Sequence, residues 1–277
     1  MAFITREDAL KRLRAQGKAG KPIVGCGAGT GISAKFAEKG GADLIIIYNS
    51  GRYRMAGRGS LAGLMPYGDA NGIVVEMAAE VLPIVQDTPV LAGVCGTDPF
   101  RLMPVFLKQL KEMGFTGIQN FPTVGLIDGN FRANLEATGM GYDKEVEVVA
   151  LARKLDLLTT PYVFDVDTAK AMAHAGADVL VAHVGLTTAG SIGAGVAFSL
   201  DEAIATVMEI AAAGKSVRKD LLVICHGGPF DEPDSVGVAL TKMPGIAGFF
   251  GASSIERLPT ERAIRGQVES FKGLPLA

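Results

Sequence analysis

Two of the three histidines in this chain stand where an apolar run ends. His183 closes the run ADVLVAHVG (177–185), and His226 closes DLLVICHGG (220–228) just before a proline. An imidazole can bind a metal ion or move a proton near neutral pH. Two imidazoles at equivalent positions therefore predict proton or metal chemistry. The third, His174, falls in a helical pattern and is expected to be structural or exposed.

Carboxylates follow the ends of three other apolar runs, at Asp98, Asp165 and Glu256. Carboxylate oxygens and imidazole nitrogens together suit a divalent cation that polarises an oxyacid or stabilises an enolate. We therefore predict a catalytic set of Asp98, Asp165, His183, His226 and Glu256. The three carboxylates are the predicted metal ligands, and a divalent cation is the predicted cofactor.

Small and amide-bearing residues at the same ends predict a site for an anion. Bare backbone N–H groups in glycine-rich turns hold phosphate or carboxylate, and in barrels such a site often follows strands seven and eight. Arg257 would add charge there. The alternative for HGGPF (226–230) is a tight turn alone. The predicted anion-binding residues are Gly27, Asn49, Ser50, Arg52, Asn120, Gly227, Gly228, Gly251, Ser253 and Ser254.

The segment 50–72 carries three arginines and six glycines. This composition predicts a mobile lid that brings positive charge over an anionic substrate. Arg52, Arg54 and Arg58 would close over the site. A solvated surface loop is the alternative for any one of these arginines.

Short apolar runs alternate with amphipathic runs along the whole chain, which predicts a parallel sheet with right-handed crossovers. Eight such units favour a (β/α)8 TIM barrel in one domain, 1–277, with an extra helix at Thr5–Gln16 on the barrel floor. The predicted strands are 21–29, 42–50, 88–100, 115–124, 159–166, 177–185, 220–228 and 245–254. The predicted helices that follow them are 32–41, 73–85, 102–114, 143–156, 167–176, 200–214, 234–243 and 260–272.

An open doubly wound sheet is the second choice of fold. The turn GCGAGTG (25–31) resembles a dinucleotide loop, but the third glycine of that motif is replaced by Thr30. The loops predicted at 51–72, 125–142 and 186–199 all follow strands. In a barrel they would lie on the face that carries active sites.

Overall composition excludes several classes of function. The formal net charge is −2 and no basic cluster occurs, which argues against nucleic acid as a partner. No apolar stretch is long enough to span a membrane, and no signal-peptide pattern is present. The three cysteines lie in apolar runs, which predicts buried free thiols in a reducing cytoplasm.

Four segments resemble a known family. They are GCGAGTGISAKFAEKGGADLIIIYNSGRYRM (25–55), AGVCGTDPF (92–100), GIQNFPTVGLIDG (117–129) and GFFGASSIERLPTERAI (248–264). They are similar to the phosphoenolpyruvate hydrolase-like (phosphonopyruvate hydrolase-like) barrel proteins and to the C-terminal barrel of the Tm-1-like proteins. The resemblance implies a link to the phosphoenolpyruvate mutase/isocitrate lyase superfamily, whose members use Mg²⁺ to stabilise an enolate. It therefore implies that the predicted divalent cation is Mg²⁺. The Lys-Lys-Cys-Gly catalytic segment of that superfamily has no counterpart here.

Together these features predict a cytoplasmic, homo-oligomeric enzyme that acts on a small anionic substrate. The expected reaction is metal-assisted lysis or hydrolysis of a 2-oxo acid or a phospho- or phosphonopyruvate-like compound, through an enolate-like intermediate. Two other classes stay open. One is a non-catalytic or nucleotide-binding barrel of the Tm-1-like type, and the other is an assembly protein.

Overall fold

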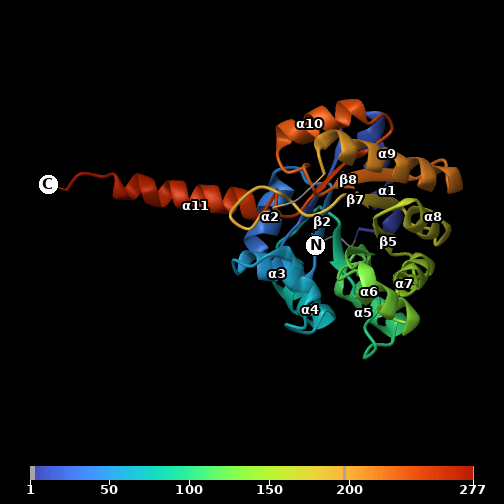
Figure 1. Ribbon diagram of the computed structural model, residues 1–277. Coiled ribbons are helices and arrows are strands. Elements are labelled where there is room, and N and C mark those ends of the chain that lie inside the picture. Colours follow the sequence, from blue (N-terminus) through green and yellow to red (C-terminus); the bar gives the residue numbers. More distant parts are fainter. Residues whose placement is uncertain (1–3, 196–197, 277) are drawn as a thin grey trace.

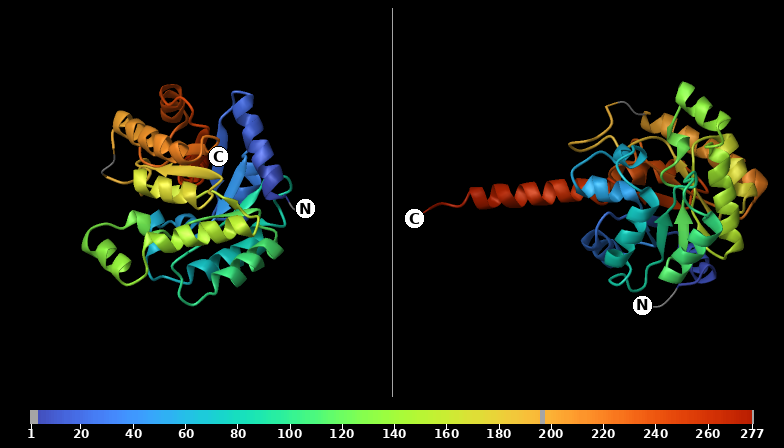
Figure 2. Two further views of the ribbon diagram at one scale, coloured as in Figure 1. Left: turned by 90° about the vertical axis from the view of Figure 1, so that its right-hand side faces the viewer. Right: turned by 90° about the horizontal axis from the view of Figure 1, so that it is seen from below.

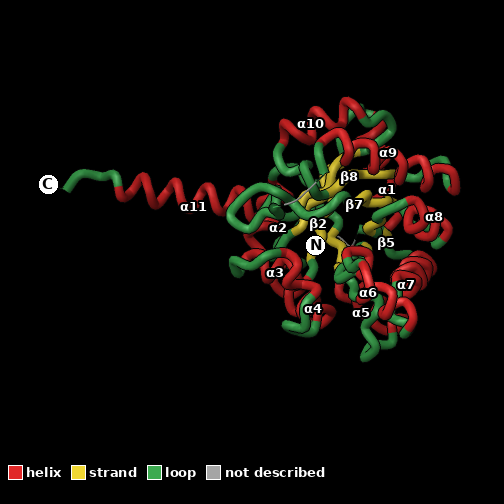
Figure 3. The backbone as a smooth tube through the Cα atoms, in the orientation of Figure 1, coloured by secondary structure: helices red, strands yellow, loops and turns green. Residues whose placement is uncertain are grey.

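The computed structural model describes residues 4–195 and 198–276 (Figure 1). Its centre is one curled sheet of parallel strands, enclosed by helices, with the order β5-β4-β3-β2-β1-β9-β8-β7-β6 (Figure 3). The strands are β1 (Ile23–Gly27), β2 (Leu44–Ile47), β3 (Val90–Gly93), β4 (Gly117–Gln119), β5 (Leu158–Thr159), β6 (Tyr162–Val163), β7 (Val179–His183), β8 (Leu222–His226) and β9 (Gly248–Gly251).

The two end strands of that order, β5 and β6, are halves of one short segment. β5 pairs with β4, and β6 pairs with β7, so residues 158–163 join both edges of the sheet. The break falls at Pro161, which has no N–H to donate to a neighbouring strand. Its carbonyl still accepts from Val181 N at 2.9 Å. The sheet is therefore closed, and the predicted (β/α)8 barrel is confirmed, with its fifth strand split.

Helices follow the strands as predicted, but two of the predicted loops contain regular structure. The segment 51–72 holds most of α3 and all of η1, and 125–142 holds α6, so the prediction of loops there is wrong. The helices are α1 (Arg6–Lys18), α2 (Gly31–Lys39), α3 (Asn49–Met55), η1 (Ser60–Leu64), α4 (Ala70–Val81), α5 (Met103–Met113), η2 (Val124–Leu126), α6 (Gly129–Ala137), α7 (Tyr142–Lys154), α8 (Val166–His174), α9 (Leu200–Val217), α10 (Pro233–Lys242) and α11 (Arg257–Lys272).

Helix α1 covers the floor of the barrel, as its sequence predicts. Ala9 and Leu13 are buried in the core. Arg6 binds the Asp178 carboxylate through Nε at 2.9 Å and through Nη2 at 2.5 Å, and Arg14 pairs with Asp220 at 2.8 Å. Both acids stand just before a strand, β7 or β8. The helix is thus held at the amino ends of the strands, and the opposite mouth stays free for a site.

The strands are apolar because most of their residues are buried on both sides. All four residues of β2, Leu44–Ile47, are buried, and so are all five of β7. A parallel strand in a barrel faces the barrel interior on one side and the helices on the other, which leaves no solvent-facing position. Burying one such side chain stabilises the fold by about 1.5–3 kcal/mol. These runs therefore fix the frame on which the strand ends are held.

Helix α11 does not pack along the barrel as the other helices do. It projects outward from the body, as Figure 1 and the right-hand view of Figure 2 show. Its buried residues are Arg257 and Leu258, both in its first turn, whereas Ile264, Val268 and Phe271 are exposed. Within the part of the chain that the structure describes, no helix is long and apolar enough to cross a membrane.

The turn after β1 passes unusually close to helix α3. A Cβ added at Gly29 would lie 2.1 Å from the carbonyl oxygen of Gly51, a distance that real side chains do not reach. Gly29 is therefore required for backbone contact between two elements. This requirement accounts for one of the glycines that resemble a dinucleotide loop.

We predict that Gly29→Ala destabilises the protein by about 1–3 kcal/mol or more, because the two backbones must separate. The matched control is Gly17→Ala in α1, where an added Cβ has open space. That variant should be stabilised by about 0.5–1 kcal/mol. Urea unfolding at pH 7 measures both. Equal effects of the two substitutions would contradict this account of Gly29.

Candidate functional site

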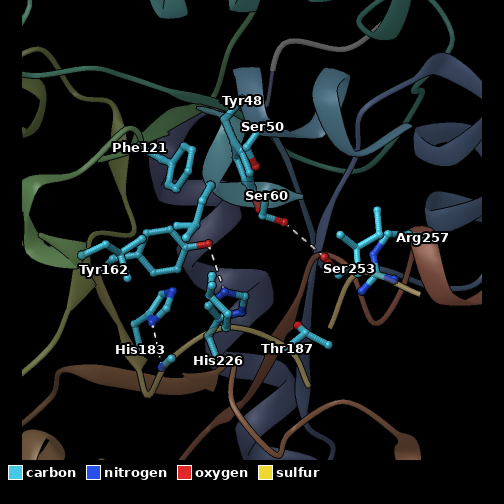
Figure 4. Close-up of a pocket in the computed structure, with 15 residues that line it drawn as sticks. Tyr48, Ser50, Ser60, Phe121, Tyr162, His183, Thr187, His226, Ser253 and Arg257 are labelled. Atoms are coloured by element: carbon cyan, nitrogen blue, oxygen red, sulfur yellow. Dashed lines mark hydrogen bonds between the residues drawn. The ribbon is translucent and has the colours of Figure 1, made fainter. Parts of the chain in front are cut away.

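A small cavity of ≈ 60 Å³ opens at the carboxyl ends of the strands (Figure 4). Polar, aromatic and apolar side chains line it from several βα-loops. The lining residues are Tyr48, Ser50, Ser60, Leu61, Phe121, Leu126, Tyr162, His183, Gly185, Leu186, Thr187, Ile192, His226, Ser253 and Arg257. This is the mouth at which barrel active sites lie.

The two strand-end histidines lie side by side in this cavity. Strands β7 and β8 pair in a register that sets His183 directly opposite His226, and their ring centroids are 4.8 Å apart. The predicted convergence of these two residues is therefore observed. His174, by contrast, is exposed on α8, and its Nδ1 bonds the Lys170 carbonyl.

The hydrogen bonds give the two imidazoles opposite tautomers. His226 Nδ1 lies 2.7 Å from the Phe250 carbonyl, so it donates and carries the proton. Its Nε2 is left as an acceptor, which Tyr162 Oη approaches at 3.4 Å. His183 Nδ1 accepts from Gly185 N at 3.1 Å, so a neutral His183 carries its proton on Nε2. The cavity is thus lined by one imidazole acceptor and one imidazole donor.

Both imidazoles are held uncharged. Burial, which disfavours the charged form, lowers the pKa of His226 to about 4. Burial also lowers the pKa of His183 well below its usual value, and the neighbouring His226 lowers it further. At neutral pH the pair is therefore a neutral donor and a neutral acceptor. The Nε2 of His226 can therefore accept a proton, whereas the Nε2–H of His183 can donate a hydrogen bond but does not give up its proton.

Two tyrosines complete the polar wall. Tyr162 from β6 packs against both histidines, with ring centroids 5.0 Å from His183 and 5.1 Å from His226. Burial raises the pKa of Tyr162 and of Tyr48, so both phenols keep their protons at neutral pH. Phe121 packs on Tyr48 at 4.8 Å between ring centroids. The phenols therefore act in this cavity as hydrogen-bond donors.

Glu256 is held away from this cavity by a buried ion pair. Its Oε2 accepts from Arg54 Nε at 2.9 Å and from Arg54 Nη2 at 2.6 Å, and both side chains are buried. Its Oε1 accepts from Gly29 N at 2.6 Å. The Glu256 charge raises the pKa of Arg54, while burial opposes it. Breaking one member of such a pair costs about 3–5 kcal/mol, so this pair ties α3 to α11.

The glycine-rich turn after β1 is filled by carboxylates of the protein itself. Gly29 N donates to Glu256, and Gly31 N donates to the Glu80 carboxylate. Gly27 lies in β1, where an added Cβ would come within 3.0 Å of Tyr48 Oη. These contacts leave the turn as a structural joint, and neither Gly27 nor Gly29 lines the cavity.

The glycines after β8 and β9 also serve the chain's own packing. Gly227 has φ +82°, and an added Cβ would lie 2.0 Å from the Gly185 carbonyl oxygen. Gly228 has φ +55° and donates its N–H to the same Gly185 oxygen at 3.0 Å. At Gly251 an added Cβ would lie 2.7 Å from Ile255. The tight-turn alternative therefore describes the 227–228 pair.

The other two predicted catalytic carboxylates have local partners instead. The Asp98 carboxylate accepts from Asn71 at 2.9 Å and pairs with Arg101 at 2.5 Å. These hydrogen bonds keep its pKa low against the opposing effect of burial. Asp165 is exposed and caps α8, where its side chain accepts from Thr168 N at 2.7 Å. Neither residue lines the cavity.

The predicted three-carboxylate metal site does not form in the described residues. Asp98, Asp165 and Glu256 have separate partners, as given above. Within residues 4–195 and 198–276, no group of three or more histidine, cysteine or acidic side chains is arranged to hold a metal ion. A divalent cation held by those three carboxylates therefore does not fit this geometry.

The arginine lid that the sequence predicted over residues 50–72 does not form. Arg52 pairs with Glu76 at 2.5 Å on the surface, and Arg58 bonds the carbonyl of Gly57 in its own turn. Arg54 is buried against Glu256. The positive charge that lines the cavity comes from Arg257, which bonds Glu261 at 2.8 Å and the Ala189 carbonyl at 3.0 Å.

The two asparagines that were predicted to bind an anion form hydrogen bonds with backbone groups and do not line the cavity. Asn49 donates to the Gly63 carbonyl at 2.8 Å, and Asn120 Oδ1 accepts from Tyr162 N at 2.7 Å. Of the predicted anion-binding residues, Ser50 and Ser253 line the cavity, whereas Ser254 does not. Ser253 Oγ lies 3.3 Å from Ser60 Oγ.

Several residues that line the cavity could not be found by looking for polar residues at the predicted strand ends. Tyr162 precedes the end of its split strand, and Ser60 and Thr187 lie within long connections. Phe121 follows β4 and is apolar, so it carries no chemical signal by itself. Tyr48 is the exception, since it stands directly after β2 and could have been found by its position.

Residues 8–274 match the phosphoenolpyruvate hydrolase-like family, and the chain belongs to this family. The predicted family resemblance is thereby confirmed. The match spans every strand of the barrel and both histidines of the cavity.

Curated relatives share much of this sequence. The ToMV susceptible protein tm-1(GCR26) of Solanum lycopersicum is 60% identical over 96% of this chain, and the ToMV resistance protein Tm-1(GCR237) of the same species is 60% identical over 98%. A putative transcriptional regulatory protein, y4pA of Sinorhizobium fredii, is 33% identical over 97%. The chain spans 35%, 36% and 44% of these relatives, so each is much longer than the barrel.

Solved structures share the fold at low identity. A 2,3-dimethylmalate lyase of the PEP mutase/isocitrate lyase superfamily matches with TM-score 0.62 at 17% identity, covering 99% of this chain and 90% of that chain. A phosphonopyruvate hydrolase in complex with oxalate and Mg²⁺ matches with TM-score 0.58 at 15% identity, covering 97% and 92%. These likenesses confirm the barrel fold.

The depressed histidine pKa values predict how stability depends on pH. An unfolded histidine titrates near 6.5, so the contribution of His226 is present above that pH and is lost as pH falls toward about 4. The free energy of unfolding of the wild type should fall by about 2 kcal/mol more than that of His226→Asn between pH 7 and pH 5. Urea unfolding of both proteins at each pH measures this difference.

The difference between the two proteins isolates the contribution of His226 to stability. The buried Glu145 is present in both, and its own contribution changes with pH in the opposite direction. Burial raises the pKa of Glu145 to about 7, so its contribution is lost as pH rises from about 4.5 to 7. If the wild type and His226→Asn had the same pH dependence, His226 would not be a buried neutral imidazole.

Proposed function

We propose that this chain is an enzyme that uses its two uncharged histidines for acid–base chemistry on a small anionic 2-oxo acid or a phospho- or phosphonopyruvate-like compound. The single observation that carries this proposal is the His183–His226 pair, with a donor and an acceptor at the mouth of a barrel. Membership of the phosphoenolpyruvate hydrolase-like family supports it. So does the small size of the cavity, which suits a ligand of few atoms.

In the proposed reaction, each histidine has a role in the cleavage of a carbon–carbon bond. In a 2-hydroxy acid, or in a 2-oxo acid bound as its hydrate, His226 Nε2 takes the proton from the hydroxyl on C2. The C2–C3 bond breaks, the hydroxyl oxygen becomes the carbonyl oxygen of one product, and the electron pair of the broken bond forms an enolate of the other product at its carboxylate. His183 Nε2–H donates a hydrogen bond to the enolate oxygen. The proton that His226 holds then returns to the enolate carbon. Proton transfer by a positioned side chain such as His226 contributes about 10²–10⁴-fold to the rate.

Side chains on the opposite wall suit the anionic group of the substrate. Arg257 brings the guanidinium, while Ser60 and Ser253 add hydroxyl donors. A guanidinium binds a carboxylate through two parallel hydrogen bonds. Arg257 now bonds Glu261 and the Ala189 carbonyl, so an anion would compete with these partners.

The expected Mg²⁺ has no place in this mechanism. The related phosphonopyruvate hydrolase structure contains Mg²⁺ and oxalate, but the three carboxylates predicted as ligands here are separated. The enolate is instead stabilised by neutral hydrogen-bond donors, His183 Nε2–H and the phenols. We derive no step through a metal ion.

Turnover of small anionic acids tests the proposal. We expect product from at least one of oxaloacetate, 2,3-dimethylmalate, phosphoenolpyruvate and phosphonopyruvate by proton NMR, at equal rates with EDTA and with Mg²⁺. His226→Asn should lower kcat about 10²–10⁴-fold, because the acceptor nitrogen is lost. His174→Asn is the matched control, since that histidine is exposed on α8, and it should leave kcat unchanged.

Two results would contradict this function. One is turnover that survives in His226→Asn. The other is binding of ATP by calorimetry with no turnover of any of the four compounds, which would favour the non-catalytic, nucleotide-binding alternative. The identity of 60% to the Tm-1 proteins favours that alternative, whereas the occupied amides of the turn at 25–31 count against it as a phosphate site.

We also propose that the chain forms a homo-oligomer through α11. Ile264, Val268 and Phe271 are 62%, 55% and 65% exposed on this projecting helix. Ile32 and Phe36 on α2 are exposed beside the start of α11, on a largely apolar groove of ≈ 730 Å³. In a symmetric dimer, the apolar face of α11 in one copy would pack in the apolar groove of the other copy, and the second copy would do the same in return.

The double substitution Ile264→Glu and Phe271→Glu should yield a monomer, because charges cannot be buried against an apolar groove. Light scattering at fixed protein concentration gives the mass. Val238→Glu on α10, where the side chain is 48% exposed, is the matched control and should keep the wild-type mass. A monomeric wild type would refute the oligomer proposal.

A further inference from the structure

A buried carboxylate outside the cavity organises one of its walls. Glu145 lies on α7 and is 1% exposed. Its Oε2 accepts from Asn120 Nδ2 at 2.5 Å and from Thr123 Oγ1 at 2.7 Å, and its Oε1 accepts from Val124 N at 2.7 Å. All three donors belong to the connection after β4. One side chain therefore fixes the course of residues 120–124.

That connection reaches the histidines in two further steps. Asn120 Oδ1 accepts from Tyr162 N at 2.7 Å, which fixes the backbone of β6. Tyr162 Oη in turn donates to His226 Nε2 at 3.4 Å. The same connection carries Phe121, which packs on Tyr162 with centroids 6.3 Å apart. A continuous chain of contacts thus runs from Glu145 to the acceptor nitrogen of His226.

We propose that Glu145 is a positioning residue whose charge state sets the placement of Tyr162, and through it the hydrogen bond to His226. This inference rests on the proposed function only for its effect on turnover. Its structural part concerns the free protein. Glu145 touches no lining histidine, so it acts through Asn120 and Tyr162.

The hydrogen bonds show why protonation would matter. The Glu145 carboxylate accepts three hydrogen bonds, and a proton on either oxygen removes the charge that strengthens them. Protonation therefore weakens the hold of Glu145 on Asn120, Thr123 and Val124. Burial raises the pKa of Glu145 to about 7, against the opposing effect of its hydrogen bonds. The change therefore falls near neutral pH, where the histidines stay uncharged.

Few charged or titratable groups face Glu145 from the neighbouring elements. Arg132 of α6 lowers its pKa, and Arg132 Nη1 itself bonds the Val124 carbonyl at 2.8 Å. Tyr142 of α7 and Cys95 after β3 are near enough for the Glu145 charge to raise their pKa values. Both keep their protons at neutral pH, so Glu145 is the group that titrates.

Nitrogen NMR of the imidazoles tests this inference without any substrate. We expect the His226 Nε2 resonance to shift between pH 5.5 and 8.5 with a midpoint near 7 in the wild type, and to stay flat in Glu145→Gln. Glu147→Gln is the matched control on the same helix, because Glu147 is exposed and pairs with Lys144; it should keep the inflection. His174, which is exposed on α8, serves as an internal reference for the imidazole resonances.

Thr123→Val offers a second variant that keeps the buried carboxylate. It removes one donor from Glu145, so the midpoint should move to higher pH. A flat His226 resonance in the wild type would overturn the proposal, and so would an inflection that persists in Glu145→Gln. If the enzyme turns over, kcat should follow the same midpoint and lose it in Glu145→Gln. If it does not, the NMR result still decides the role of Glu145.

Discussion

The pairing register of β7 and β8 is the constraint on which the site depends. Because His183 and His226 are register partners on adjacent strands, their rings must share one environment at the strand ends. That environment is buried, and burial disfavours a positive charge on either ring. Each neutral ring then takes the tautomer that fits its hydrogen bond to the backbone. Gly185 and the Phe250 carbonyl thus decide which nitrogen carries each proton.

This arrangement of the site depends on closure of the barrel. Residues 158–163 bridge β4 and β7, and the same segment brings Tyr162 between the histidines and Phe121. Pro161 divides the segment without opening the sheet. The position of Tyr162 therefore follows from closing the barrel, and the contacts of Asn120 and Glu145 refine it.

Much of the fold could be predicted from the sequence, because the strand runs are apolar throughout and alternate with amphipathic helices. The rule that active groups stand at strand ends correctly brought His183 and His226 together. It failed for Asp165, whose spacing to Thr168 is that of a helix cap, a signal visible in the sequence. It also failed for the glycines of 25–31, because Gly29 packs against the backbone of Gly51 and the amides of Gly29 and Gly31 donate to Glu256 and Glu80.

Other features could not have been predicted from local patterns. Arg54 and Glu256 are 202 positions apart, so only the fold shows that they neutralise each other. The same is true of Glu80, which fills the turn that a phosphate would need. Contacts within the chain thus satisfy the three predicted metal ligands: Arg54 pairs with Glu256, Arg101 pairs with Asp98, and Asp165 caps α8.

The central claim is the opposite tautomers of two neutral imidazoles. Nitrogen NMR of histidine-labelled protein at pH 7 tests it most directly, through the chemical shifts and proton couplings of each ring nitrogen. The account predicts a proton on Nε2 of His183 and on Nδ1 of His226, with neither ring doubly protonated. A charged ring, or the same tautomer at both positions, would contradict it.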